Sequence, residues 1–386
     1  MSNRALVILL LTTFITFSSL YLPQPLLPNF TAALEILPSE AALLISLPML
    51  SLGIVPLVIG FTFPRLPPYP VLRIALPLLA VSNMVVLTID SFGPLLLIRI
   101  AQGLLLPVIF TALMTCCAHI APSGKLRQYL AYYVAATVLG GFSGRVASGA
   151  IATVFDWHYS FFILGLAIAG AAIAVRFLDK DVHRDTQDFH AQEFLHTLRK
   201  PGVFSVLATI FLFFLTYSAI LNTVPFRMVH LSPLISEFGI ASVYFGYLVG
   251  IVIAVASERL IAFFGGPAAT LNRVFLLFGC AIGLFLVPSN FALALVMLLA
   301  SAGFFLLHAM LSGVVNQLAD GRNSVANGLY VSAYYTGGSI GAWLAPSLFH
   351  QIGWNGLMLL LLLLTGVAWV ASRAISPQIA AASSET

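Results

Sequence analysis

Long apolar segments separated by short polar ones run through the whole chain. A helix needs about 20 mostly apolar residues to cross the roughly 30 Å hydrocarbon core of a bilayer. Twelve segments meet this requirement: residues 5–28, 40–60, 71–89, 94–118, 128–152, 159–178, 202–225, 238–258, 270–287, 289–313, 325–349 and 355–374. The pattern predicts an all-α membrane protein with about twelve transmembrane helices.

Composition agrees with this prediction. The 386 residues are 60% hydrophobic and only 8% charged, whereas soluble domains carry about 25% charged residues. So few charges do not cover a water-facing surface, and we expect the lipid bilayer to surround most of the chain. The formal net charge of +4 is not gathered in one patch, so no nucleic-acid partner is expected.

The positions of Lys and Arg predict the orientation, because cytoplasmic loops of membrane proteins carry an excess of both. With both termini in the cytoplasm, fourteen of the 17 basic residues lie on the cytoplasmic side and only Arg227 lies outside. The remaining two, Arg99 and Arg145, fall inside predicted spans. We therefore expect a multi-pass protein with both termini in the cytoplasm.

The two halves of the chain align with each other. When the sequence is shifted by 197 residues, Trp157 aligns with Trp354. The same shift aligns three glycines of the first half, Gly140, Gly141 and Gly144, with Gly337, Gly338 and Gly341 of the second half. This repeat predicts two six-helix bundles, 1–178 and 202–386, joined by a charged cytoplasmic linker, 179–201. Parallel repeats are typical of secondary transporters, with a substrate site near the bilayer midplane and alternating access.

The glycines have two interpretations, which the sequence leaves open. Small residues let helix backbones approach closely in lipid, and glycines form one thin face on the fifth predicted span and another on the eleventh. These faces consist of Gly140, Gly141, Gly144 and Gly149, and of Gly337, Gly338 and Gly341. They are either the surfaces on which the halves slide or ordinary packing within each half.

Ionisable side chains inside the predicted spans are few, and such residues are usually functional. Arg99, Arg145 and His308 lie there, whereas no Asp or Glu lies deep in any span. Arginine is too basic to exchange protons, so His308 is the best titratable candidate for coupling to protons. The alternatives are packing for His308 and hydrogen bonding between helices for the two arginines.

Uncharged polar residues add a predicted cavity lining, whose members are Tyr21, Gln24, Gln102, Tyr217, Asn222, Asn316, Tyr334 and Tyr335. Aromatic rings with hydroxyls suit amphipathic organic ligands, although each residue taken singly also fits a structural role. The three cysteines have no metal-ligand spacing, and no metal or cofactor is expected. No carboxylate pair or Ser/His/Asp set supports a membrane-embedded enzyme; a non-transporting sensor is a further alternative.

Two motifs carry a resemblance that extends over the whole chain. Arg99-Ile100-Ala101-Gln102-Gly103 is similar to the R-x-x-Q-G motif of the major facilitator superfamily. The segment GGFSGRVASG, from Gly140 to Gly149, lies where efflux members of that superfamily carry a glycine-rich motif, with Arg145 in place of the usual proline. The resemblance implies the major facilitator fold.

Further segments resemble the YnfM-type branch of bacterial efflux permeases: YLPQPLLP, NTVPFRM, GFFLLHAMLSG and NGLYVSAYYTGGSIG. This resemblance implies a monomeric inner-membrane exporter of small organic compounds with proton antiport. A carrier of organic anions, with Arg99 and Arg145 forming a positive pocket, is the alternative.

One loop departs from the superfamily pattern G-x-x-x-D-R-x-G-R-R. After Gly60 the chain reads FTFPRLPPYP, where Arg65 matches but Pro64 takes the acidic position. The corresponding loop of the second half keeps Glu258-Arg259. In the superfamily, the Asp of this motif tethers the two halves in the outward-facing state, a contact called the latch below. We expect Glu258-Arg259 to replace part of this latch.

Overall fold

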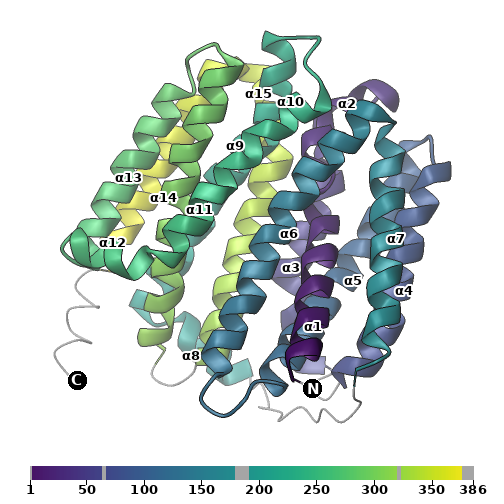
Figure 1. Cartoon of the computed structure of the whole chain (residues 1–386). Coiled ribbons are helices and arrows are strands. Elements are labelled where there is room, and N and C mark those ends of the chain that lie inside the picture. The colour runs from purple at the N-terminus through teal and green to yellow at the C-terminus, as the bar shows by residue number, and fades with distance from the viewer. Residues whose placement is uncertain (1, 63–66, 179–190, 320–322, 376–386) are drawn as a thin grey trace. The chain divides into compact units, whose positions relative to one another are not determined.

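The computed structural model describes residues 2–62, 67–178, 191–319 and 323–375. These residues form α-helices and short 3-10 helices, without a strand among them. The chain divides into two compact units (Figure 1): unit 1 comprises Met1–Asp188 and Ile235–Ser242, and unit 2 comprises Phe189–Leu234 and Val243–Thr386.

In its described residues, the first part of unit 1 forms six long helices and three shorter elements. Their bounds are α1 Ser2–Tyr21, η1 Gln24–Leu26, α2 Leu27–Ala33, α3 Pro38–Thr62, α4 Pro68–Val85, η2 Val86–Thr88, α5 Phe92–His119, α6 Leu126–Val154 and α7 Trp157–Val175. Unit 1 also includes α10, Glu237–Ala241, which comes from the second half of the sequence. This segment is the one place where the structural division departs from a simple split at the linker.

Unit 2 contains α8 Ala191–Leu198, α9 Pro201–Leu231, η3 Ser242–Phe245, α11 Gly246–Val255, α12 Ser257–Phe263, α13 Pro267–Leu284, α14 Asn290–Gln317 and α15 Asn323–Ser372, with Ser242 at the junction of the units. In the predicted linker, residues 191–198 form α8, which packs on α9 and α15. Residues 179–190 of the linker lie outside the described part of the chain, as does Arg65.

Within the described residues, eleven helices are long and apolar enough to cross a membrane. One of them, α15, has 50 residues and would measure about 75 Å at 1.5 Å per residue, more than twice the hydrocarbon thickness. Gly353 breaks it, because its φ of 72° and ψ of 176° are not helical. The predicted spans 325–349 and 355–374 therefore correspond to the two arms of α15.

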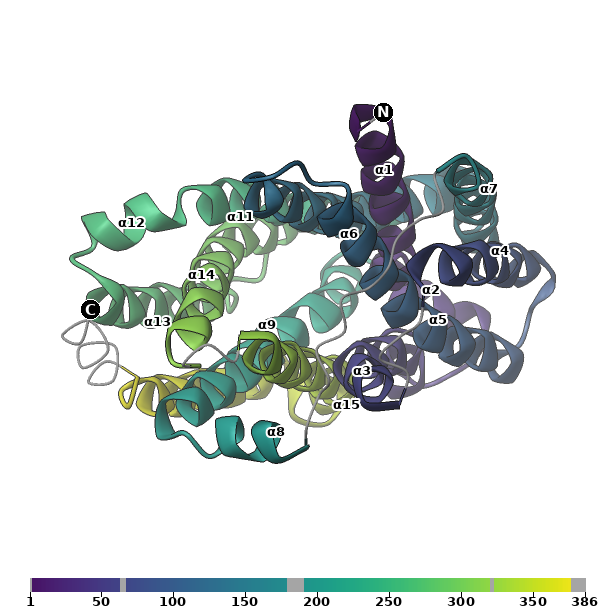
Figure 2. The same cartoon turned by 90° about the horizontal axis from the view of Figure 1, so that it is seen from below.

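The helices pair in the same order in both units (Figures 1 and 2). In unit 1, α1 packs on α6, α3 on α5, and α4 on both α5 and α7. In unit 2, α9 packs on α15, α11 on α14, and α13 on both α14 and α15. Corresponding spans thus make corresponding contacts, as expected from a duplicated six-helix bundle.

The repeated glycines pack inside each unit. A Cβ atom at Gly140 would overlap the carbonyl oxygen of Phe14, and one at Gly337 would overlap that of Phe211. The next pairs one turn along are Gly144 with Ser18 and Gly341 with Leu215. Each of these contacts lies between the first and fifth spans of one half. Of the two open interpretations, packing within a half applies to these four glycines.

Candidate functional site

Arg99 lies in α5 with a fully buried side chain. Its Nε donates to the carbonyl oxygen of Leu44 at 2.7 Å, and its two terminal nitrogens donate to Ser19 O at 3.0 Å and Leu20 O at 3.1 Å. The side chain of Gln102, one turn further, accepts from Nη1 at 2.6 Å and donates to Ser82 Oγ at 3.2 Å. Arg99 therefore joins α1, α3 and α5.

Prolines explain why these carbonyls need an external donor. The carbonyl of Ser19 would bond the amide of residue 23 in a continuing helix, and that of Leu44 the amide of residue 48. Both positions are proline, which has no N–H. Unsatisfied backbone groups cost several kcal/mol in lipid, so the guanidinium satisfies two acceptors that proline has freed. The geometry favours a positioning role for Arg99.

Arg145 forms a second buried cluster in unit 1. Its Nε donates to the side-chain oxygen of Gln24, its Nη1 donates to Gly141 O at 2.7 Å, and its guanidinium carbon lies 3.9 Å from the centre of the Tyr21 ring. Three predicted site residues, Tyr21, Gln24 and Arg145, are thus brought together by α1, η1 and α6. The cluster lies beside the C-terminal end of α1, where the helix dipole favours a positive charge.

The aromatic cluster of unit 2 joins α9, α14 and α15. Tyr334 stacks on Phe214 with ring centres 3.9 Å apart, contacts Tyr335 edge to face at 4.9 Å, and lies 4.9 Å from the His308 ring. Phe304 stacks parallel to His308 at 6.0 Å. Tyr334, Tyr335 and His308 are only half-buried. The cluster therefore presents ring faces and hydroxyls together, which suits a flat amphipathic molecule.

His308 and Tyr330 form a hydrogen-bonding pair that tolerates both charge states of the imidazole. The Tyr330 hydroxyl lies 2.9 Å from His308 Nδ1 and 3.2 Å from the His308 carbonyl oxygen. When Nδ1 is unprotonated, the hydroxyl donates to it. When Nδ1 carries a proton, it donates to the hydroxyl, whose own proton turns to the carbonyl. In both states, the Tyr330 hydroxyl and His308 Nδ1 remain hydrogen-bonded to each other.

Two other predicted site residues lie in the core of unit 2. Tyr217 is fully buried, stacks on Phe304 at 4.1 Å and bonds Ser301 Oγ at 2.9 Å. Asn222 is also fully buried, and its Nδ2 donates to Ser218 O at 2.7 Å. It lies seven residues beyond Leu215, on the α9 face that packs against α15. Both residues are buried, but the Oδ1 atom of Asn222 has no hydrogen-bond partner among the described residues.

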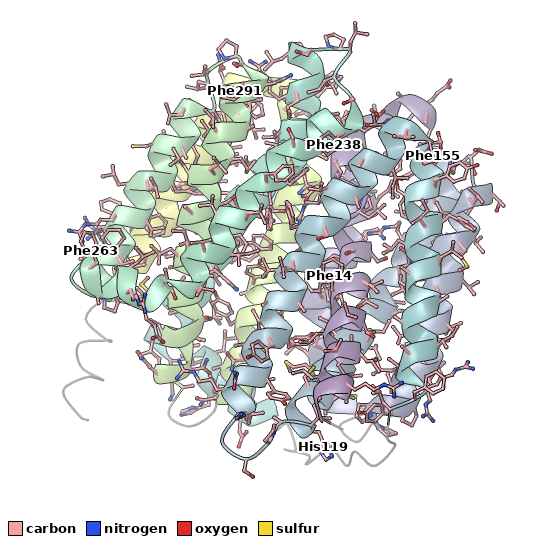
Figure 3. All side chains as sticks on the ribbon, viewed as in Figure 1. Phe14, His119, Phe155, Phe238, Phe263 and Phe291 are labelled. Atoms are coloured by element: carbon pink, nitrogen blue, oxygen red, sulfur yellow. The ribbon has the colours of Figure 1, made fainter. Side chains whose placement is uncertain are left out.

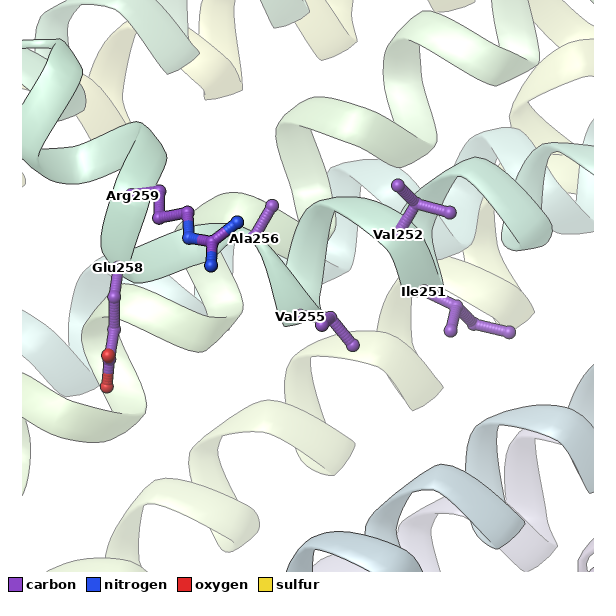
Figure 4. Close-up of a pocket in the computed structure, with 6 residues that line it drawn as sticks. All are labelled: Ile251, Val252, Val255, Ala256, Glu258 and Arg259. Carbon is purple, nitrogen blue, oxygen red and sulfur yellow. The ribbon is translucent and has the colours of Figure 1, made fainter.

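Glu258 and Arg259 lie on α12, and both are exposed. With Ile251, Val252, Val255 and Ala256 they line a pocket between α11 and α12 (Figure 4). The close-up shows the Arg259 side chain extending toward Ala256 and the Glu258 carboxylate extending away from it. The predicted latch role of this pair concerns contacts with the other half and stays a prediction.

Several side chains of these clusters were not predicted from the sequence. Phe214, Phe304 and Tyr330 complete the aromatic cluster, but a single aromatic ring carries no signal in a chain with 30 Phe and 12 Tyr residues. Pro23 and Pro48 did carry a signal: each proline marks the carbonyl four residues earlier as an acceptor that needs a donor. Tyr244 fits the same rule, since its hydroxyl donates at 2.9 Å to Leu221 O, which Pro225 leaves unpaired.

Comparisons with known proteins agree with the fold and the motifs. The model of the Major Facilitator Superfamily matches residues 9–342. The inner membrane transport protein YnfM of Escherichia coli is 27% identical over 369 residues, covering 91% of this chain and 87% of the relative. The MFS-type transporter YybF of Bacillus subtilis is 24% identical, covering 91% and 88%. An uncharacterized transporter of Buchnera aphidicola is 25% identical, covering 92% and 87%.

Among solved structures, the human organic anion transporter MFSD10 (TETRAN) superposes with a TM-score of 0.71 and 19% identity. The match covers 96% of this chain and 99% of the human one. The chain therefore belongs to the Major Facilitator Superfamily and is a multi-pass membrane transporter. The predicted all-α membrane fold and the family resemblance are confirmed.

Proposed function

We propose that the protein exports small amphipathic organic compounds across the bacterial inner membrane by alternating access, in exchange for protons. Both termini lie in the cytoplasm in this proposal, and the protein acts as a monomer. The half-buried aromatic cluster of His308, Tyr334 and Tyr335 carries the proposal, because stacked rings with hydroxyls bind flat molecules that also carry a polar group.

The pair His308–Tyr330 supports coupling to protons. The Tyr330 hydroxyl can donate to His308 Nδ1 or accept from it, so the pair accommodates the gain and loss of a proton. The ring also contacts Tyr334 of the aromatic cluster. A proton on His308 and a substrate on Tyr334 would therefore affect each other directly, which is what exchange of the two requires.

The best alternative is a carrier of organic anions. Arg145 supports it, since a fully buried guanidinium lies beside Tyr21 and Gln24, and every Asp or Glu in the predicted spans lies near a span end. Arg99 supports it less, because its donors already bond three carbonyls. Both functions share the fold and differ in the charge of the substrate.

A proton-flux assay in inverted membrane vesicles tests the proposal. An acid interior is established and read with a quenched dye, and cationic, neutral and anionic aromatic probes are added in turn. We expect dequenching by amphipathic probes from the parent protein, and its loss in His308→Ala. No response to any probe, from protein shown to be folded, would contradict proton exchange and point to a carrier driven by another gradient.

The same vesicles separate the two substrate classes. In Arg145→Gln, an exporter of cationic or neutral compounds keeps its probe preference, whereas an anion carrier loses anionic probes selectively. Tyr334→Leu provides the reciprocal variant: we expect it to weaken aromatic probes of every charge, because it removes a stacking face from the cluster.

A further inference from the structure

Arg227 lies near the C-terminal end of α9 and is the one basic residue that the predicted orientation places on the outer side. Lys and Arg are normally concentrated in cytoplasmic loops, so an arginine at the outer end of a span needs a particular reason. The surroundings of its guanidinium, all of them in unit 2, indicate what that reason is.

The internal repeat shows that packing at this position does not require a charge. The shift of 197 residues pairs Arg227 with Phe30, just as it pairs the two tryptophans. The fully buried Phe30 ring packs edge to face on Trp157, with ring centres 5.1 Å apart. In unit 2 the guanidinium carbon of Arg227 lies 5.5 Å from the centre of the Trp354 ring. Both units thus make the contact with tryptophan, but only unit 2 makes it with a cation.

The Arg227 guanidinium has no polar partner within the described part of the chain. Its Nε is enclosed and lacks a hydrogen-bond partner there. Its two terminal nitrogens are not enclosed, and no hydrogen bond or ion pair with a described residue involves them. A guanidinium presents a planar fork of donors that matches the oxygens of a phosphate or carboxylate. The accessible terminal nitrogens therefore suit an oxyanion at the protein surface.

No acidic side chain neutralises this end of unit 2. The described segments that form it are 226–234, 243–247, 285–292 and 349–356, and they contain no Asp or Glu. They do contain two exposed histidines, His230, which lies one turn beyond Arg227 on α9, and His350 on α15. A surface with basic side chains and no acidic ones attracts anions.

Exposed apolar side chains border the arginine. Asn290, at the start of α14, donates from Nδ2 to Met228 O at 3.2 Å, which places this part of the chain beside the residue that follows the arginine. Its Oδ1 is enclosed, so that acceptor does not face the surface. Val287 and Phe291 are 44% and 74% exposed, and Figure 3 labels Phe291 at the end of unit 2 opposite Phe263 of α12. A cation bordered by exposed apolar groups matches an amphiphile better than a freely dissolved ion.

We propose that Arg227 binds the phosphate of an anionic phospholipid at the outer face of the bilayer, with the acyl chains against the apolar side chains beside Asn290. The terminal nitrogens donate to the phosphate oxygens. Trp354 supports the guanidinium and is itself fixed, because its Nε1 donates to Phe285 O at 2.7 Å. The inference goes beyond the proposed transport and does not rest on it.

Lipid binding to the purified protein tests this site without any transport measurement. Native mass spectrometry of the full chain in detergent follows titrations with phosphatidylglycerol, which is anionic, and phosphatidylcholine, which has no net charge. Arg227→Phe introduces the residue that unit 1 has at this position, so it keeps a contact with Trp354 and removes the charge. We expect it to weaken binding of the first phosphatidylglycerol about tenfold or more, because the hydrogen bonds of a charged group are lost. Binding of phosphatidylcholine should not change, and equal affinity of parent and variant for phosphatidylglycerol would overturn the proposal.

Arg373→Gln is the matched control. The Arg373 guanidinium carbon also lies over a tryptophan of α15, 4.1 Å from the centre of the Trp369 ring, but at the other end of that helix. We expect the control to bind phosphatidylglycerol as tightly as the parent. A loss as large as that in Arg227→Phe would show that any arginine of unit 2 attracts the lipid, and would overturn a specific site. Thermal unfolding without added lipid shows that each variant is folded, and Arg227→Gln gives the same test if the phenylalanine variant is not.

Glycerol phosphate separates a lipid from a soluble anion, because it carries the phosphate and glycerol of the headgroup without acyl chains. We expect it to leave bound phosphatidylglycerol in place at equal concentration, since it gains nothing from the apolar side chains. Displacement at equal concentration, lost in Arg227→Phe, would overturn the lipid assignment and identify a site for soluble oxyanions.

Discussion

The carbonyl oxygen of Phe14 lies against Gly140 so closely that a Cβ atom would overlap it, and Phe211 stands in the same relationship to Gly337. Both pairs are separated by the same shift of 197 residues. The glycines recur because a main-chain carbonyl of the first span occupies the space of their missing side chains. The two halves therefore share these contacts between a glycine and a backbone carbonyl, although the side chains around them differ.

Gly140→Ala should destabilise the protein. Alanine improves helix propensity by up to about 1 kcal/mol, but overpacking against a fixed carbonyl costs about 1–3 kcal/mol, so the clash dominates. Thermal unfolding in detergent measures the difference. Gly170→Ala in α7 is the control, since a Cβ there meets nothing within 4 Å. A Gly140→Ala variant as stable as this control would refute the close contact.

Arg99→Lys should lower stability and reduce transport of every substrate alike. An ammonium has no planar fork to reach three carbonyls from two helices, and each buried carbonyl left unsatisfied costs about 1–3 kcal/mol. Unfolding in detergent and uptake of cationic, neutral and anionic probes provide the two measurements. Arg176→Lys, at the exposed end of α7, controls for the substitution. Selective loss of anionic probes with unchanged stability would instead favour substrate contact by Arg99.

Tyr244 and Pro225 should be energetically coupled. Tyr244→Phe leaves the Leu221 carbonyl without its donor, whereas Pro225→Ala restores the helical N–H that makes this donor unnecessary. A double-mutant cycle on unfolding should give a coupling of about 0.5–1.5 kcal/mol, the size of one hydrogen bond. Additive effects of the two substitutions would show that the tyrosine does not replace the missing amide.

Tyr330→Phe should slow proton-coupled transport about tenfold, because one hydrogen bond worth about 1.4 kcal/mol is lost in the protonated state of His308. His308→Gln should abolish the pH dependence altogether. Transport rates across a series of internal pH values distinguish the two variants. Tyr132→Phe on the exposed face of α6 is the control, and equal behaviour of Tyr330→Phe and this control would exclude the proton-exchanging pair.

Local polarity and periodicity in the sequence were sufficient to predict the membrane class, the spans and the duplication. Apolar length alone marks a membrane helix, because lipid leaves the backbone no other way to satisfy its hydrogen bonds. The predicted spans 94–118 and 128–152 agree with α5 and α6 to within two residues at each end. Where helices break, agreement is poorer: the span predicted over 238–258 is divided among α10, η3, α11 and α12.

Tertiary structure decided what the buried polar residues do. Sequence placed Arg99 and Arg145 in the membrane, but only packing shows one on carbonyls freed by proline and the other over the Tyr21 ring. Likewise, the sequence does not reveal the partners of Glu237, because α2 and α6 bring Asn29 and Thr153 within reach of its carboxylate only in the folded chain. Hydropathy is a property of single residues, whereas the partner of a polar group depends on which helices meet. That information is spread over positions more than 200 residues apart.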